Sequence, residues 1–383
     1  MTDRGLTITL SSVSRDGRSR TAAVIVGVLN DLDIAPRLVT FASRDCLQTL
    51  RELAGRDLEL CHVRIRRPLW AKGDALNAIA LPLEAARRRL LTRRIIACDT
   101  AIHGYPVDAR ILKLVCFPHE LVAEIEERYK APLYRLYGIV SQSIYRRAVN
   151  SASYRGTFLA NSQYTRDALL RAYPVREDAV TVVYAPASEP VSLNGEFDRP
   201  RARIVTVLGG FHPDKRQLEA VQLAREIPSA RFILMGSARS RRYLQQCRRE
   251  ARSLRNVSFV IDASDADVTR ILTKSRVLLH LKHNEHFGLA TVEGILRGCV
   301  PFVHDSGGQR EVVPLDALRF QGADELVSGV SRVLDTSHRN DLAALRKYVE
   351  RFTTEAFISR VRPIVTAWLE PSDHLREMEV GRS

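Results

Sequence analysis

Two glutamates, Glu285 and Glu293, enclose an apolar segment in the sequence NEHFGLATVEG (residues 284–294). The apolar spacing after Gly288 predicts a helix that begins near Leu289, and the first N–H groups of a helix form an anion site. Gly288 lets the backbone approach a ligand closely. We predict that Glu285 holds a sugar, the helix start a phosphate and Glu293 a ribose diol. The alternative is structural, since the helix dipole favours acidic side chains near the first turn.

Two further loops carry residues suited to the same ligand. The sequence VHDSGGQREVV (residues 303–313) places Gly307 and Gly308 between a strand and a helix, where successive N–H groups form a second anion site. A plain connecting loop explains one glycine at this place better than it explains two. The sequence LGGFHPDKRQ (residues 208–217) adds His212 and Lys215, and a lysine contacts a diphosphate as a point charge. Together, at successive strand ends, the three loops predict a nucleoside-diphosphate ligand.

The elements that position these loops alternate between strands and helices along the chain. Such alternation predicts parallel sheets with helices on both faces, and ligands bind beyond the carboxyl ends of their strands. The predicted strands are Leu6–Val13, Leu58–Val63, Arg94–Cys98, Leu112–Cys116, Thr157–Ala160, Val180–Tyr184, Ile204–Leu208, Arg231–Met235, Val257–Ile261, Val277–His280 and Pro301–Val303. Among the predicted helices are Thr21–Leu32, Asp74–Leu91, Glu120–Tyr129, a helix capped by Ser162, Gln217–Ile227, Arg241–Leu254, Ala266–Lys274, Glu325–Leu334, Asp341–Phe352 and Thr354–Leu369.

A proline-rich stretch with few apolar residues, Tyr184 to Ala202, interrupts the alternation and predicts a linker. The predicted fold class is therefore α/β, with two doubly wound Rossmann-like domains facing each other across a cleft. The predicted boundaries are 1–188 for an N-terminal acceptor domain, 189–202 for the linker, 203–352 for a C-terminal donor domain, 353–370 for a helix packing back on the first domain, and 371–383 for a polar tail.

Composition narrows the function classes. The 383 residues carry a formal net charge of +14, which favours a polyanionic partner such as nucleic acid, an anionic membrane surface or a phosphorylated substrate. No apolar run reaches the ~20 residues of a membrane span, and the first residues lack signal-peptide features, so export is not expected. The six cysteines form no C-x-x-C pair. Basic clusters at residues 64–68, 87–94 and 241–252 do not alternate with aromatic residues as single-strand binding platforms do.

The motif EHFGLATVE, followed by SGGQREVV, resembles the signature of the family-four glycosyltransferases of GT-B fold. The match is closest to the GDP-mannose-dependent α-1,2-mannosyltransferases of dolichol-linked oligosaccharide assembly. The stretches HLKHNEHFG, VHDSGG, FHPDK, ANSQYTRD and VVYAPA resemble that subgroup as well, and CDTAIHGY and CFPHE do so more loosely. The resemblance extends from about Ile95 to Val313.

This resemblance implies transfer of a sugar with retained configuration, in which the protein, without a metal or other cofactor, stabilises the leaving diphosphate. The implied catalytic residues are Glu285, Lys215 and His119, and the last lies three residues after Cys116, which takes the usual histidine position. Members of the family commonly carry arginine where this chain has Gly210, and His212 is the predicted replacement. The implied donor-binding residues are Gly210, His212, Lys215, Glu285, His286, Phe287, Gly288, Leu289, Glu293, Gly307 and Gly308.

The predicted function is a retaining glycosyltransferase that moves a hexose, with mannose favoured, from a nucleoside-diphosphate sugar to a lipid-linked or other glycan acceptor. GDP-mannose and an anionic membrane surface are the expected partners, and the expected location is peripheral, on the cytoplasmic face of a membrane. The alternatives are a basic nucleic-acid-binding protein and a sugar-nucleotide epimerase of the same fold, although nucleic acid is not the favoured partner. No metal site is expected from His280, His283, His286 and Glu285, because their spacing straddles a strand and a turn.

Overall fold

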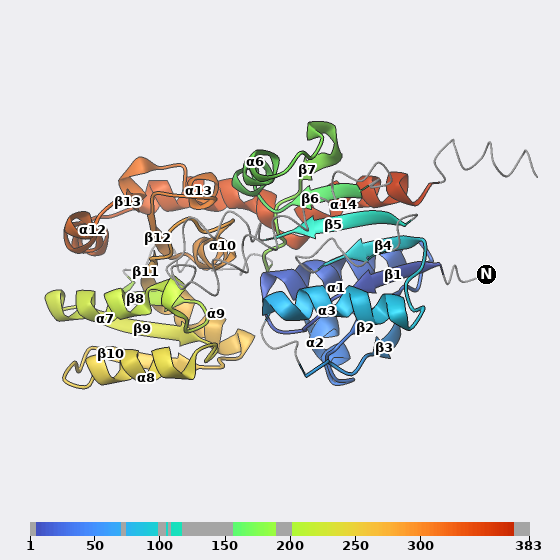
Figure 1. Ribbon diagram of the computed structural model, residues 1–383. Helices are drawn as coiled ribbons and strands as arrows, with labels where there is room; N and C mark the ends of the chain where they lie inside the picture. The colour runs from blue at the N-terminus through green and yellow to red at the C-terminus, as the bar shows by residue number, and fades with distance from the viewer. Residues whose placement is uncertain are drawn as a thin grey trace, which may run out of the picture. The chain divides into compact units, whose positions relative to one another are not determined.

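The computed structural model describes residues 5–69, 74–98, 105, 109–116, 156–188 and 201–370 (Figure 1). His119, the predicted helix Glu120–Tyr129 and most of the predicted linker lie outside these residues. The chain divides into two compact units. Among the described residues, the first unit contains the chain up to residue 186 and the segment from Thr354 onward, and the second contains residues 187–353.

The first unit is built on a seven-stranded parallel sheet of order β3-β2-β1-β4-β5-β6-β7. Its strands are β1 (Leu6–Thr9), β2 (Arg37–Thr40), β3 (Cys61–Arg64), β4 (Arg94–Ala97), β5 (Arg110–Val115), β6 (Gly156–Ala160) and β7 (Val180–Val182). Its described helices are α1 (Gly17–Asn30), α2 (Cys46–Ala54), α3 (Asp74–Arg87), α6 (Gln163–Ala172), the 3-10 turn η2 (Glu177–Ala179) and α14 (Thr354–Leu369). All the predicted strands of this unit are present, and Ser162 caps α6 by accepting from the Thr165 amide.

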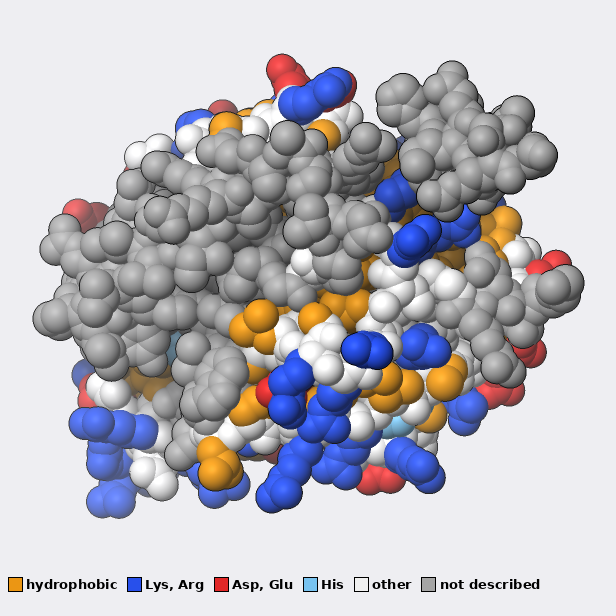
Figure 2. All heavy atoms as spheres, turned by 45° about the vertical axis from the view of Figure 1, so that its right-hand side comes forward, with side chains coloured by type: hydrophobic (Ala, Val, Ile, Leu, Met, Phe, Trp, Pro, Cys, Tyr) orange, Lys and Arg blue, Asp and Glu red, His pale blue; other side chains and the backbone are white. Residues whose placement is uncertain are grey.

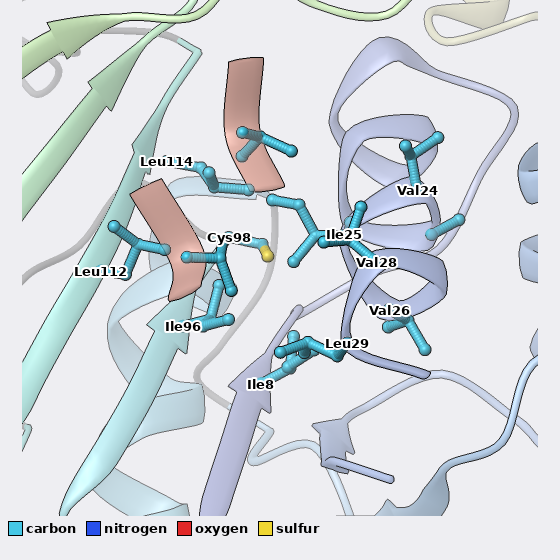
Figure 3. Packing of buried hydrophobic residues seen from close by; sticks show 14 of the residues in the cluster. Ile8, Val24, Ile25, Val26, Val28, Leu29, Ile96, Cys98, Leu112 and Leu114 are labelled. Carbon is cyan, nitrogen blue, oxygen red and sulfur yellow. The ribbon is translucent and has the colours of Figure 1, made fainter. Parts of the chain in front are cut away.

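The core of the first unit forms where α1 packs on the sheet. Helix α1 is apolar around most of its circumference, as expected of a helix buried on more than one side. Figure 3 shows Ile25 and Leu29 of α1 facing Ile8 of β1 and Ile96 of β4. The C-terminal helix α14 adds four buried side chains to the same cluster, namely Phe357, Val361, Val365 and Trp368. Helix α14 therefore belongs to the first unit, although the whole second unit precedes it in sequence.

The second unit is built on a six-stranded parallel sheet of order β10-β9-β8-β11-β12-β13. Its strands are β8 (Ala202–Leu208), β9 (Arg231–Gly236), β10 (Val257–Ile261), β11 (Ser275–His280), β12 (Val300–His304) and β13 (Arg319–Phe320). Its helices are η4 (Pro213–Lys215), α7 (Gln217–Glu226), α8 (Arg241–Glu250), α9 (Asp265–Lys274), α10 (Leu289–Leu296), α11 (Gln309–Val312), η5 (Asp316–Leu318), α12 (Ala323–Asp335), α13 (Arg339–Val349) and η6 (Glu350–Phe352). Strand β10 has the predicted bounds, and α10 begins at Leu289 as predicted.

Two parallel sheets, with helices between most of the strands that follow one another in the described part of the chain, confirm the predicted α/β fold of two doubly wound domains. In the second unit the strand order reverses between β8 and β11, which are neighbours in the sheet. At such a reversal, the loops that leave the carboxyl ends of the two strands diverge and leave room for a ligand. Within the described part of the chain, no helix is both long enough and apolar enough to cross a membrane.

Candidate active site

The loops after β8 and β11 meet at the reversal and bring two of the predicted catalytic residues into contact. Lys215, at the end of η4, places its Nζ atom 2.5 Å from Oε2 of Glu285, in the loop after β11. Both side chains are partly shielded, with 23% of Lys215 and 13% of Glu285 exposed. The structure therefore pairs the residue predicted to contact a diphosphate with the residue predicted to contact a sugar.

Two further charged residues, Asp214 and Lys282, complete this network and were not singled out from the sequence. Lys282 follows β11, and its side chain is 5% exposed. Its Nζ atom lies 3.6 Å from Oδ2 of Asp214 and 3.9 Å from Oε1 of Glu285. Asp214 also contacts His212, with 2.5 Å between Oδ1 and Nδ1. Two carboxylates and two ammonium groups thus share one largely buried site, and their formal charges cancel.

The cations keep both carboxylates ionised. Burial acts to raise the pKa of Glu285, but Lys215, Lys282 and a hydrogen bond with His280 together hold that pKa well below its usual range. Asp214 behaves alike: burial opposes ionisation, yet the hydrogen bond with His212 and the charges of Lys282 and Lys215 lower its pKa. Burial lowers the pKa of His280, whose Nε2 atom lies 3.3 Å from Oε2 of Glu285. The carboxylates are therefore charged at neutral pH, and the His280 imidazole is neutral.

Helix α10 begins beside this network, and its first amides are open to an anion. Gly288 caps the helix with φ of 110°, a conformation that strongly favours glycine. Among the described residues, the amides of Leu289 and Ala290 have no hydrogen-bond acceptor. Glu293 lies one turn further along and is half-buried, and its Oε1 atom accepts a hydrogen bond of 3.3 Å from Ser188. Amides at a helix start can bind an anion, and phosphate binding at the start of α10 stays a prediction.

Gly307 and Gly308, in the loop after β12, allow that loop to pack against the backbone of the Glu285 loop. A Cβ atom at Gly307 would lie 2.4 Å from the carbonyl oxygen of Glu285, and one at Gly308 would lie 2.3 Å from that of His286. The Gly308 amide donates a 2.7 Å hydrogen bond to the Glu285 carbonyl, so it is engaged within the protein. The two glycines therefore support the Glu285 loop, and their contact with a ligand stays a prediction.

Another side chain packs against Gly210, the position at which members of the family that this chain resembles commonly carry arginine. A Cβ atom at Gly210 would lie 2.6 Å from Cδ of Arg239, which comes from the loop after β9. His212, the predicted replacement, caps η4 and contacts Asp214. The aliphatic part of the Arg239 side chain, which comes from a neighbouring loop, therefore fills the space beside Gly210.

The histidines near the site contact other rings or lie close to Glu285. His283 stacks on His304 with ring centroids 3.6 Å apart, and burial together with His304 and Arg216 lowers the pKa of His283 to about 4. His286 lies 3.9 Å from Glu285, measured from Nδ1 to Oε1. In the ranges that the structure describes, no three His, Cys, Asp or Glu side chains are arranged to hold a metal ion. Independence from metal stays a prediction.

Residues 196–351 match the family model described as Glycosyl transferases group 1. The second unit is a group 1 glycosyltransferase domain. The chain is also similar to curated proteins named GDP-Man:Man(3)GlcNAc(2)-PP-Dol alpha-1,2-mannosyltransferase. The relative from Neurospora crassa is 28% identical over 207 residues, which cover 47% of this chain and 37% of the relative. The relative from Dictyostelium discoideum is 29% identical over 173 residues, which cover 41% of this chain and 33% of the relative.

Solved structures extend the likeness to the whole fold. The crystal structure of a glycosyltransferase from Rickettsia africae ESF-5 aligns with a TM-score of 0.71 at 14% identity and covers 96% of this chain and 99% of that chain. This likeness confirms the predicted GT-B fold. The matched regions cover only about a third of the length of the two curated relatives.

The glycosyltransferase domain contains functional candidates that sequence reasoning missed, and their positions explain why. Asp214 directly precedes Lys215, and Lys282 lies three residues before Glu285. A charged residue in a polar loop is normally solvated, so neither position indicated burial. Ser188 was missed because it is distant in sequence from Glu293, with which it forms a hydrogen bond. The available signal was the unusual density of charge in HPDK and HLKHNEH.

Proposed function

We propose that this chain transfers mannose from GDP-mannose to a lipid-linked glycan acceptor, with retention of the anomeric configuration. The observation that carries the proposal is the ion pair of Lys215 and Glu285, located where the strand order of the glycosyltransferase domain reverses and beside the open amides of α10. The choice of mannose, of guanosine and of a lipid-linked acceptor is supported by the names of the curated relatives.

The roles follow from the charges of the site. A bound diphosphate offers anionic oxygens to Lys215 and to the amides of Leu289 and Ala290, while Glu285 accepts hydrogen bonds from hydroxyls of the sugar. Glu293, held by Ser188, is suited to the ribose. Fixed cations and amides aimed at the leaving diphosphate stabilise the charge that develops as the glycosidic bond breaks. We propose that these groups replace a metal ion, and that His119 acts on the acceptor side, as the family resemblance implies.

We further propose that the first unit binds an anionic membrane surface on the cytoplasmic face. Strand β3 is followed by a segment in which Arg64, Arg66 and Arg67 are exposed and Leu69 is 89% exposed. Figure 2 shows Lys and Arg side chains gathered over the lower part of the view, with hydrophobic side chains between them. Arginines attract anionic headgroups, and an exposed leucine inserts among acyl chains. We call residues 64–69 the basic segment.

The test is a panel of GDP-mannose, GDP-glucose, UDP-glucose and UDP-N-acetylglucosamine with the purified chain. Protection against thermal unfolding and release of nucleoside diphosphate are measured for each donor. Protection and turnover that are largest with GDP-mannose support the proposal, and an equal lack of response to all four contradicts it. If the chain instead binds nucleic acid with a steep dependence on salt, its charge serves the alternative function.

A further inference from the structure

Lys282 is the most deeply buried cation of the charge network, with 5% of its side chain exposed. Burying an ammonium group is costly unless nearby carboxylates compensate for its lost hydration. Asp214 and Glu285 provide this compensation at 3.6 and 3.9 Å. Lys282 follows β11, whereas Asp214 lies in η4 after β8. The pair of Lys282 and Asp214 therefore joins the two loops on which the candidate site is built.

The two lysines differ in what a ligand can reach. Lys215 is 23% exposed, so a ligand in the site can contact its Nζ atom, whereas Lys282 is nearly enclosed. The argument rests on the proposed function, in which a nucleoside diphosphate binds Lys215. An ammonium group that turns toward a diphosphate weakens its contact with Glu285. A buried carboxylate that loses its cation tends to take up a proton, and a protonated Glu285 has a lower capacity to accept hydrogen bonds from a sugar.

We propose that Lys282 is a positioning residue that keeps Glu285 ionised while Lys215 contacts the bound diphosphate. The charged and titratable groups facing Glu285 come from two loops and the end of one strand. Lys215 comes from η4, His280 from the end of β11, and Lys282 and His286 from the loop that contains Glu285. Asp214 fixes Lys282 because it is itself held by His212.

Proton uptake on GDP binding tests this role. Binding of GDP is measured by calorimetry near neutral pH in two buffers that differ in ionisation enthalpy, which yields the protons taken up per GDP. Lys282→Met should take up more protons than wild type, up to about one per GDP bound, because Glu285 protonates when Lys215 turns away. The double variant K282M/E285Q should lose this extra uptake, which assigns the proton to Glu285. Lys347→Met, an exposed lysine of α13, is the matched control.

A second measurement needs no ligand, because Lys215→Met imitates a Lys215 that is engaged elsewhere. In K215M, Lys282 still holds the folded pKa of Glu285 low, so stability falls as pH drops through the acid range. In K215M/K282M, burial dominates and the folded pKa of Glu285 exceeds its unfolded value, so stability falls as pH rises through the unfolded pKa toward neutrality. The unfolding free energy across pH distinguishes these profiles. If K282M does not fold, D214N/K282M removes both charges of the pair and serves in its place.

The outcomes separate the two proposals. Equal proton uptake by wild type and K282M, or extra uptake that persists in K282M/E285Q, would overturn the role of Lys282 even if GDP binds as proposed. If wild type does not bind GDP, the nucleotide assignment fails, and the ligand-free profiles decide on Lys282. Matching pH profiles for K215M and K215M/K282M would overturn the role of Lys282, and profiles of opposite slope would support it.

Discussion

The substitution Glu285→Gln separates donor binding from catalysis at the candidate site. Glutamine keeps the size of the side chain but removes the charge that pairs with Lys215 at 2.5 Å. A diphosphate then no longer competes with a carboxylate for Lys215, so GDP should bind E285Q at least as tightly as wild type. Turnover should fall by ~100-fold or more, which corresponds to ~2.7 kcal/mol of lost transition-state stabilisation. The loss arises because a neutral amide accepts hydrogen bonds from sugar hydroxyls less strongly than a carboxylate.

Glu293→Gln is the matched comparison. Glu293 lies in α10, one turn after the start of the helix, and accepts a hydrogen bond from Ser188. If it holds the ribose, E293Q should raise the Michaelis constant for the donor with a smaller effect on turnover. Steady-state kinetics with GDP-mannose and calorimetric binding of GDP give both quantities, after circular dichroism shows that each variant is folded. If both variants lose only ~0.3–1 kcal/mol of stability and keep full activity, the glutamates serve the helix dipole alone.

Four other predictions follow from single features of the structure. Lys215→Met should weaken GDP binding by about tenfold or more, which is the contribution of a charge-assisted contact, and should leave guanosine binding unchanged. Equal losses of affinity for GDP and guanosine, measured by calorimetry, would show that Lys215 does not contact the diphosphate. Gly308→Ala should cost roughly 1–3 kcal/mol in chemical denaturation because its Cβ atom meets the backbone, whereas Gly322→Ala, with nothing within 4 Å, should be nearly neutral. The loss of stability caused by E285Q should be largest near neutral pH and should shrink below about pH 4. The reason is that the depressed pKa of Glu285 contributes stability to the wild type that is lost as pH falls. A loss of stability that does not change with pH would contradict the ion pair. The basic segment contains three arginines, Arg64, Arg66 and Arg67. Replacing all three by glutamine should reduce both the sedimentation of the protein with phosphatidylserine vesicles and the salt dependence of that sedimentation. Unchanged sedimentation would exclude the basic segment as the membrane-binding surface.

The regular elements of the second unit could be predicted because hydrophobic periodicity determines them directly. The run Val257–Ile261 is bounded by polar residues and became β10 with those bounds. Glycine and apolar spacing placed the start of α10 at Leu289. Strand β13 was missed because its two residues give too short a run to show a period. Strand β2 of the first unit was also missed, although other strands of four residues were predicted.

The candidate site was predictable in its loops and less so in its contacts. A sequence shows that Lys215 and Glu285 each follow a strand of one domain, but it does not show that these strands, β8 and β11, are neighbours in the sheet. The burial of Lys282 depends on that adjacency, because its partner Asp214 comes from the other loop. The glycines after β12 predicted an anion site, and only the structure shows that their loop packs against the backbone of the Glu285 loop.

The most direct test of the central claim is transfer itself, with the ion pair of Lys215 and Glu285 intact and broken. Purified wild type and E285Q are incubated with GDP-mannose and a lipid-diphosphate-linked mannose oligosaccharide in vesicles, and the product is analysed by nuclear magnetic resonance. The account predicts that wild type adds mannose with the α configuration of the donor retained, and that E285Q binds GDP but forms product at least ~100-fold more slowly. A β-linked product, or equal rates for the two proteins, would contradict it.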